Sequence, residues 1–302
     1  MKTKIEWTDQ TWNPVSGCTK VSQGCKHCYA ERHAKRFWGA RKFSDIRRHG
    51  ERLDQPLRWR RPRRVFVNSM SDLFHPRVPF GFVDQVFAVM ALASSHQFQI
   101  LTKRPERMAE YMAIKTGQRL CDTTCARVGA AAGQIAADRG EDVNAPNWDL
   151  CWTWPLRNVW LGVSVEDQST ADERIPLLLR TPAALRFVSF EPLLGPVFMS
   201  WAWFARNMDE TGIDWAICGG ESGPSARPMH PDWARSIRDQ CVAADVPFFF
   251  KQWGEWFPAG PRIFEAPMVL MGREAFYRLG KTRAGRDLDG RKWDEFPEVS
   301  AA

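Results

Sequence analysis

Three cysteines lie close together near the N-terminus. Cys18, Cys25 and Cys28 fall within eleven residues and are separated by six and then by two residues. The first residues, MKTKIEWTDQ, are charged and contain no apolar core, so we expect no secretory signal and a cytoplasmic protein. In that compartment cysteines stay reduced, and clustered thiols serve more often as metal ligands than as disulfide partners. We therefore interpret the three cysteines as metal ligands.

Three thiolates are compatible with two kinds of metal site. A structural zinc ion takes four ligands, and His27 or His33 could complete a set of three cysteines and one histidine. A [4Fe–4S] cluster held by three cysteines instead leaves one iron without a protein ligand, open to a substrate or cofactor. The spacing alone leaves both interpretations open.

Short apolar runs, rich in β-branched and aromatic residues, recur along the rest of the chain. They cover residues 64–69, 96–102, 158–164, 185–190, 214–218 and 246–251. A first strand is expected near residues 11–14, and amphipathic segments such as 82–94 and 231–244 are typical of helices. This alternation predicts an α/β fold, a partial (β/α) barrel of about six to seven parallel strands.

Polar residues follow nearly every predicted strand. The carboxyl ends of parallel strands meet at one edge of a sheet, so these side chains should line one pocket. Glu191 and Lys251 are the candidate catalytic residues, with Glu191 acting as an acid or base or pairing with a nearby cation. Gly219 and Gly220 either let a ligand approach the backbone or form an ordinary turn, and Glu221 can accept hydrogen bonds.

We expect residues 1–257 to form the barrel and residues 258–302 to be a C-terminal extension without an assigned function. Residues 116–156 interrupt the alternation, and we interpret them as an insertion within the barrel because so short a segment rarely sustains its own core. The insertion contains Cys121, Cys125 and Cys151, which would either bind a second metal or lie in the core.

Positive charge is concentrated in residues 31–64. This stretch has thirteen Arg and Lys against four acidic residues, whereas the net charge of the whole chain is +7. Four aromatic residues are interleaved with it: Phe37, Trp38, Phe43 and Trp59. This mixture suits phosphates and unstacked bases, so it predicts contact with DNA or RNA, although a solvated Arg-rich surface would have the same composition. The chain has no apolar run of about 18 residues, so we expect no membrane span.

Several segments spread over almost the full length carry a family resemblance. They include IEWTDQTWNPVSGCTKVSQGCKHCYAER, FQILTKRPERM, NVWLGVSVEDQ, RFVSFEPLLGP and DWAICGGESGPSARPMHPDWARSIRDQC. With its C-x6-C-x2-C loop, the chain resembles a phage and bacterial family of radical S-adenosylmethionine (SAM) proteins of unknown function. The first gap in the loop is longer than in the usual radical SAM motif. The resemblance implies a [4Fe–4S] cluster on Cys18, Cys25 and Cys28, SAM as cofactor, and an association with phage or mobile DNA.

The resemblance also implies roles for polar residues at the strand ends. SAM would be bound through its amino group by Ser71 and Asp72 and through its ribose by Ser164 and Glu166, while the segment Gly219, Gly220 and Glu221 would also contact it. An electron donor such as flavodoxin or ferredoxin would reduce the cluster. The expected function is generation of a 5′-deoxyadenosyl radical that modifies or repairs a nucleobase or nucleic acid. The alternatives are a zinc-stabilised nucleic-acid-binding protein and a radical SAM enzyme acting on a metabolite or peptide.

Overall fold

The main sheet contains seven parallel strands in the order β1-β4-β5-β6-β7-β8-β9. The computed structural model describes residues 3, 5–113, 123–141, 154–204, 212–259 and 264–298. The strands of this sheet are β1 (Gln10–Trp12), β4 (Arg64–Val67), β5 (Gln97–Thr102), β6 (Val159–Ser164), β7 (Leu185–Phe190), β8 (Trp215–Gly219) and β9 (Phe248–Gln252). This topology confirms the predicted fold class, an α/β partial (β/α) barrel.

The six predicted apolar runs and the first predicted strand all coincide with strands of this sheet. The run at residues 185–190 matches β7 at both ends. All residues of β6 and β7 are buried, which explains why these strands are apolar almost without interruption. Strands covered on both faces have no solvent-facing side, so they lack the alternation of a half-exposed strand.

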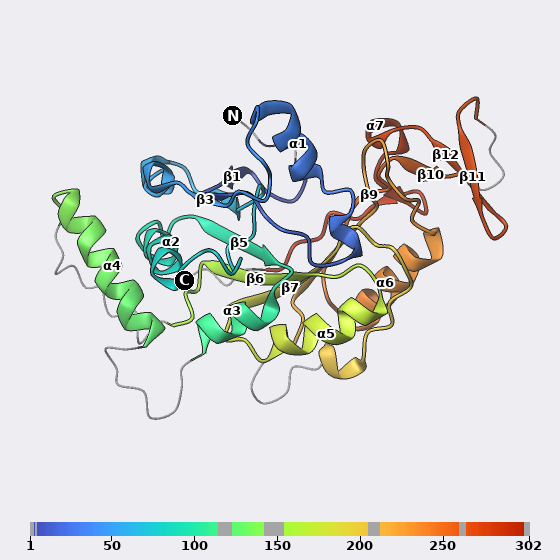
Figure 1. The fold of residues 1–302 in the computed structure, drawn as a ribbon. Coiled ribbons are helices and arrows are strands. Elements are labelled where there is room, and N and C mark those ends of the chain that lie inside the picture. The colour runs from blue at the N-terminus through green and yellow to red at the C-terminus, as the bar shows by residue number, and fades with distance from the viewer. Residues whose placement is uncertain are drawn as a thin grey trace. The chain divides into compact units, whose positions relative to one another are not determined.

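Helices follow most strands, as Figure 1 shows. They are α1 (Tyr29–Phe37), α2 (Phe80–Leu92), α3 (Pro105–Met112), α4 (Thr124–Asp138), α5 (Gln168–Leu179), α6 (Pro231–Ala243) and α7 (Lys281–Ala284). Short 3-10 helices are η1 (Gln23–Cys25), η2 (Gly50–Arg52), η3 (Pro56–Arg58) and η5 (Trp201–Trp203). Both α3 and α6 begin with proline, whose missing N–H costs nothing in the first turn.

The chain divides into two compact units. Unit 1 comprises residues 1–19, 34–162 and 180–185, and unit 2 comprises residues 20–33, 163–179 and 186–302. The boundary therefore falls within the cysteine loop. It places Cys18 in unit 1, and Cys25 and Cys28 in unit 2.

In unit 1, the described part of the predicted insertion is helix α4, which lies beside α2 (Figure 1). The Arg127 guanidinium on α4 donates to the buried Asp84 carboxylate on α2 at 3.0 Å, and the Tyr111 hydroxyl donates to the same carboxylate at 2.9 Å. Cys125 is buried and lies 3.1 Å from the Thr123 hydroxyl. Cys121 and Cys151 lie outside the described residues.

In unit 2, the C-terminal extension packs against the main sheet. The Phe250 N–H donates to the Trp293 carbonyl at 2.9 Å, and Phe249 forms an antiparallel bridge with Asp294. These contacts give β9, the last strand of the sheet, a hydrogen-bonded neighbour. They therefore cover an edge whose unpaired backbone groups could otherwise pair with another chain. The smaller strands are β10 (Trp256–Pro258), β11 (Met268–Met271) and β12 (Glu274–Arg278) in one sheet, with β2 (Val15–Ser16) paired to β3 (Arg47–Arg48) and β13 (Asp287–Leu288) to β14 (Arg291–Lys292).

In the part of the chain that the structure describes, no helix has the length and apolar character needed to cross a membrane.

Two glycines at α4 should respond oppositely to replacement by alanine. Gly133 lies inside the helix, and a Cβ there would meet no atom within 4 Å. We expect Gly133→Ala to raise the free energy of unfolding by about 0.5–1 kcal/mol, because alanine is the better helix former. Gly140 follows the helix with φ +70°, a conformation that alanine adopts only with strain. Gly140→Ala should therefore lower the free energy of unfolding by about 1 kcal/mol. Thermal unfolding of both variants tests this, and a lower Tm for Gly133→Ala would contradict the helix.

Candidate functional site

The three cysteines of the loop are not joined in disulfide bonds, and all three are partly exposed. Cys25 ends η1, and Cys28 immediately precedes α1. Burial raises the pKa of the Cys28 thiol, and the negative charge of Cys25 adds to this, although the N–H groups of Glu31 and Ala30 oppose it. The loop thus carries three thiols that a metal can reach, which the buried Cys218 and Cys241 do not offer.

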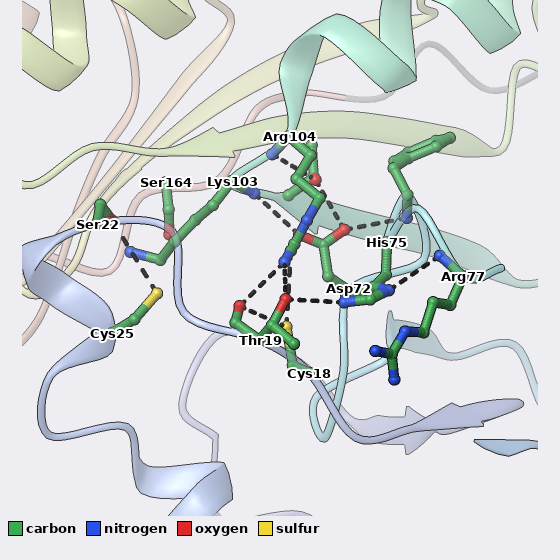
Figure 2. A network of polar contacts seen from close by, with 12 residues as sticks. Cys18, Thr19, Ser22, Cys25, Asp72, His75, Arg77, Lys103, Arg104 and Ser164 are labelled. Atoms are coloured by element: carbon green, nitrogen blue, oxygen red, sulfur yellow. Dashed lines mark hydrogen bonds and ion pairs between the residues drawn. The ribbon is translucent and has the colours of Figure 1, made fainter. Parts of the chain in front are cut away.

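In unit 1, Arg104 connects the loop to the end of β5. Its Nη1 donates to the Cys18 Sγ at 3.6 Å and to the Asp72 carboxylate at 2.8 Å (Figure 2). Its Nη2 donates to the Thr19 carbonyl at 2.9 Å and to the Thr19 hydroxyl at 3.1 Å. Burial opposes the charge of Arg104, but the negative charges of Asp72 and Cys18 outweigh it and raise its pKa.

Asp72 is buried and accepts hydrogen bonds on both carboxylate oxygens. Its further donors are the Thr102 hydroxyl at 2.8 Å and the backbone N–H groups of Lys103 at 3.2 Å and Phe74 at 3.0 Å. The neighbouring Ser71 donates through its hydroxyl to the Val15 carbonyl at 2.8 Å. Both residues after β4 therefore support the cysteine loop and the strand that leads into it.

His75 lies beside the same network as a neutral ring. Its Nδ1 accepts from the Arg77 N–H at 3.1 Å, which leaves the proton on Nε2, 2.9 Å from the Thr19 hydroxyl. Burial and the nearby positive charge of Arg104 lower the pKa of His75 to about 4. At neutral pH His75 therefore contributes a hydrogen bond and no charge.

In unit 2, Glu166 connects the loop to the end of β6. The Ser22 hydroxyl donates to the fully buried Glu166 carboxylate at 2.6 Å, and Arg174 pairs with that carboxylate at 3.4 Å. Arg174 also donates to the Ser164 carbonyl at 2.8 Å. Gly24 lies directly over Glu166, since a Cβ on Gly24 would lie 2.6 Å from the carboxylate. The predicted ribose ligands Ser164 and Glu166 thus both belong to the support of the loop.

Glu221, after β8, holds the loop through a second arginine. Its two carboxylate oxygens accept from Arg227 at 2.8 and 2.9 Å, and the same guanidinium donates to the Gln23 carbonyl at 3.0 Å. Arg32, on α1, donates to the Ser222 carbonyl at 2.8 Å. The residues on both sides of Cys25 and Cys28 are therefore fastened to the end of β8.

Glu191 and Lys251 form an ion pair across the ends of β7 and β9. The Lys251 Nζ lies 2.7 and 2.8 Å from the two Glu191 oxygens, and the Gln252 amide donates to one of them at 3.3 Å. The two predicted catalytic residues therefore contact each other directly, and both are partly buried.

The two glycines after β8 have different surroundings. A Cβ on Gly219 would make ordinary contacts with Lys251 at 3.4 Å and Glu191 at 3.5 Å. A Cβ on Gly220 would lie 2.0 Å from the Trp253 carbonyl oxygen, so glycine is required there for two backbone segments to pass. The roles of Gly219, Gly220 and Glu221 in binding a cofactor stay predictions.

The structure adds four side chains to the candidate site, namely Ser22, Arg104, Arg174 and Arg227. Arg104 closely follows a strand, which is a signal that the sequence offers, whereas no local pattern marks the other three. Among the described residues, no three His, Cys, Asp or Glu side chains are arranged to hold a metal ion. The cysteines as metal ligands, and Ser71, Asp72, Ser164 and Glu166 as SAM ligands, therefore stay predictions.

A family comparison covers nearly the whole chain. Residues 2–297 match the family described as "Protein of unknown function (DUF5131)". The chain belongs to this family. No curated protein matches this DUF5131 member.

Among solved structures, this DUF5131 protein is similar to spore photoproduct lyase. A cysteine-to-serine mutant of that enzyme aligns with 9% identity and a TM-score of 0.41, covering 92% of this chain and 70% of the lyase. The lyase complexed with dinucleoside spore photoproduct aligns with 9% identity and a TM-score of 0.38, covering 87% and 66% of the two chains.

Gly24 provides a direct test of the loop support. We expect Gly24→Ala to lower the free energy of unfolding by about 1–3 kcal/mol, because the added methyl group overlaps a buried carboxylate held by Ser22 and Arg174. Gly50→Ala is the matched control, since a Cβ there would meet nothing within 4 Å, and its change should stay within about 0.5 kcal/mol. Denaturant unfolding measures both, and equal stabilities would contradict the close contact between Gly24 and Glu166.

Proposed function

We propose that this protein is a radical SAM enzyme that binds a [4Fe–4S] cluster through Cys18, Cys25 and Cys28 and modifies or repairs a nucleobase in DNA or RNA. One observation carries the proposal: three partly exposed cysteines lie on one loop whose backbone carbonyls accept hydrogen bonds from Arg104 and Arg227. A loop that only connected two elements would not need three buried or half-buried arginines and a buried glutamate to hold it.

The chemical nature of the donors supports such a cluster. Three thiols supply three iron ligands and leave a fourth iron for SAM. Arg104, 3.6 Å from the Cys18 sulfur, provides a positive charge that favours the thiolate form needed for ligation. When bound, the cluster supplies the electron that cleaves the sulfonium of SAM. A flavodoxin or ferredoxin would deliver that electron, and an association with phage or mobile DNA belongs to the same proposal.

The remaining roles belong to the residues at the strand ends. Asp72, Glu166 and Glu221 already accept from arginines, so they would act on SAM through the loop that they hold. Ser71, Ser164, Gly219 and Gly220 would contact SAM directly. Lys251 and Glu191, already paired at 2.7 Å, would exchange a proton with the substrate.

Residues 31–64 support a nucleic acid as the substrate. Eight of the basic residues in this stretch are exposed: Lys35, Arg36, Lys42, Arg47, Arg48, Arg58, Arg60 and Arg61. Phe37, at the end of α1, is 60% exposed, and the Arg36 guanidinium lies 5.2 Å from its ring centroid, so an exposed aromatic ring and a cation lie side by side. Other members are used internally, since Arg41 stacks on Trp38 at 4.0 Å and donates to the Ser16 carbonyl.

Replacing the cysteines tests the cluster. We expect anaerobically reconstituted wild-type protein to contain iron and sulfide, and Cys18→Ala, Cys25→Ala or Cys28→Ala each to lose most of both, because a cluster held by two thiolates is easily lost. Cys241→Ala is the matched control, since Cys241 is buried on α6 away from the loop. Iron, sulfide and zinc analysis with an anaerobic absorption spectrum provides the measurement.

Two results of that analysis would contradict the proposal. Wild-type protein that contains zinc and no sulfide would favour the zinc-stabilised binding protein, and Cys18→Ala would then unfold instead of remaining folded without iron. Reconstituted protein that never forms 5′-deoxyadenosine from SAM and a reductant would exclude the radical reaction.

Charge reversal tests the nucleic-acid surface. We expect single-stranded DNA or RNA to bind wild-type protein with an affinity that falls as salt rises, and the double variant Arg60→Glu/Arg61→Glu to reduce the salt slope by about 2. The control Arg273→Glu/Arg283→Glu makes the same change in net charge on exposed residues of the C-terminal extension. Fluorescence anisotropy across a salt series measures this. Wild-type protein that binds neither polymer at low salt would favour a metabolite or peptide substrate.

A further inference from the structure

The cation beside Cys18 is held in a fixed position from two sides. The Asp72 carboxylate accepts from Arg104 at 2.8 Å, while the Thr19 carbonyl and hydroxyl accept from its other nitrogen at 2.9 and 3.1 Å (Figure 2). Only 9% of the Arg104 side chain and 7% of the Asp72 side chain are exposed. These hydrogen bonds keep the guanidinium beside the sulfur. A surface arginine without them could rotate away.

Asp72 is itself fixed by backbone and side chain donors. The Thr102 hydroxyl, the Lys103 N–H and the Phe74 N–H all donate to it. The carboxylate therefore stays in place whatever the state of the sulfur, and so does the arginine that it orients. Such outer partners of a metal ligand set both the geometry and the electronic properties of the metal site.

The neighbouring His75 ring adds no second positive charge to that of Arg104. His75 donates from Nε2 to the Thr19 hydroxyl and accepts at Nδ1 from the Arg77 backbone, which is the pattern of a neutral imidazole. A fixed positive charge within 4 Å of a ligand sulfur acts most strongly when the cluster gains an electron, because the added negative charge is shared with the sulfurs.

We infer that Arg104, oriented by Asp72, is a positioning residue that holds Cys18 in place for the cluster and raises the cluster's reduction potential. This inference rests on the proposed function, because it requires a cluster on Cys18. It goes further by assigning two separate effects to one side chain: hydrogen bonds that fix the first cysteine, and a charge that eases reduction. The two effects can be separated by substitutions that remove one or both.

The experiment compares full-length wild-type, Arg104→Met and Arg104→Lys proteins after anaerobic reconstitution. Arg104→Met removes both effects, so we expect iron to bind about 10- to 100-fold less tightly and the remaining cluster to have a more negative midpoint potential. Arg104→Lys keeps the charge and loses the planar fork, so iron should bind more weakly while the potential stays near the wild-type value. Iron analysis and a redox titration followed by electron paramagnetic resonance provide the two readouts.

Arg127→Met is the control for general loss of stability. It breaks the ion pair with Asp84 between α4 and α2, away from the cysteine loop, and should leave iron binding and potential unchanged. Circular dichroism establishes that each variant is folded, and if Arg104→Met is not, Arg104→Lys and Asp72→Asn give the answer. For Asp72→Asn we expect weaker iron binding, because Arg104 loses the group that orients it.

The outcomes separate the two proposals. A wild-type protein that takes up no iron and sulfide overturns the proposed function and this inference together. A wild-type cluster with an Arg104→Met variant of equal iron content and equal potential overturns this inference alone. An equal fall in potential in the Met and Lys variants would mean that geometry, not charge, sets the potential, and would overturn the assignment of an electrostatic effect.

Discussion

The buried ion pair between Asp72 and Arg104 is the interaction on which the start of the cysteine loop depends. Either charge alone would cost several kcal/mol to bury, so each is tolerable only with the other and with the hydrogen bonds that complete it. Removing one partner should cost about 3–5 kcal/mol, since the other would remain buried and unpaired. Through this pair the ends of β4 and β5 determine where Cys18 and Thr19 lie.

The same arrangement recurs in unit 2, where three acidic residues at strand ends are each paired with a cation. The pairs are Glu166 with Arg174, Glu191 with Lys251, and Glu221 with Arg227. Ser22 donates to the first carboxylate, and the Arg227 guanidinium of the third pair donates to the Gln23 carbonyl. Because this part of the loop has only one 3-10 turn of its own, side chains from the strand ends supply the hydrogen bonds that secondary structure would otherwise provide.

Much of the fold could be predicted from the sequence, because buried parallel strands leave a local signal. The run at residues 185–190 is apolar at nearly every position, and the structure makes it β7 with all six residues buried. The acidic residues at the strand ends were also visible, because each follows an apolar run within three residues. Their partners were not, since Arg104 is 32 residues from Asp72 and Arg174 lies on the helix after Glu166. For Glu191, the alternative of an ion pair with a nearby cation agrees with the Lys251 contact.

The sequence by itself determined which chemical groups are present and in what order: three closely spaced thiols, acids after strands, and a basic stretch rich in aromatic residues. These features follow from residue type and local spacing, which need no knowledge of distant contacts. Only the tertiary structure decided that Asp72, Glu166 and Glu221 form ion pairs with the arginines that hold the loop. Pairing between residues far apart in the chain depends on how the strands are ordered in the sheet. The type of a single residue does not determine that order.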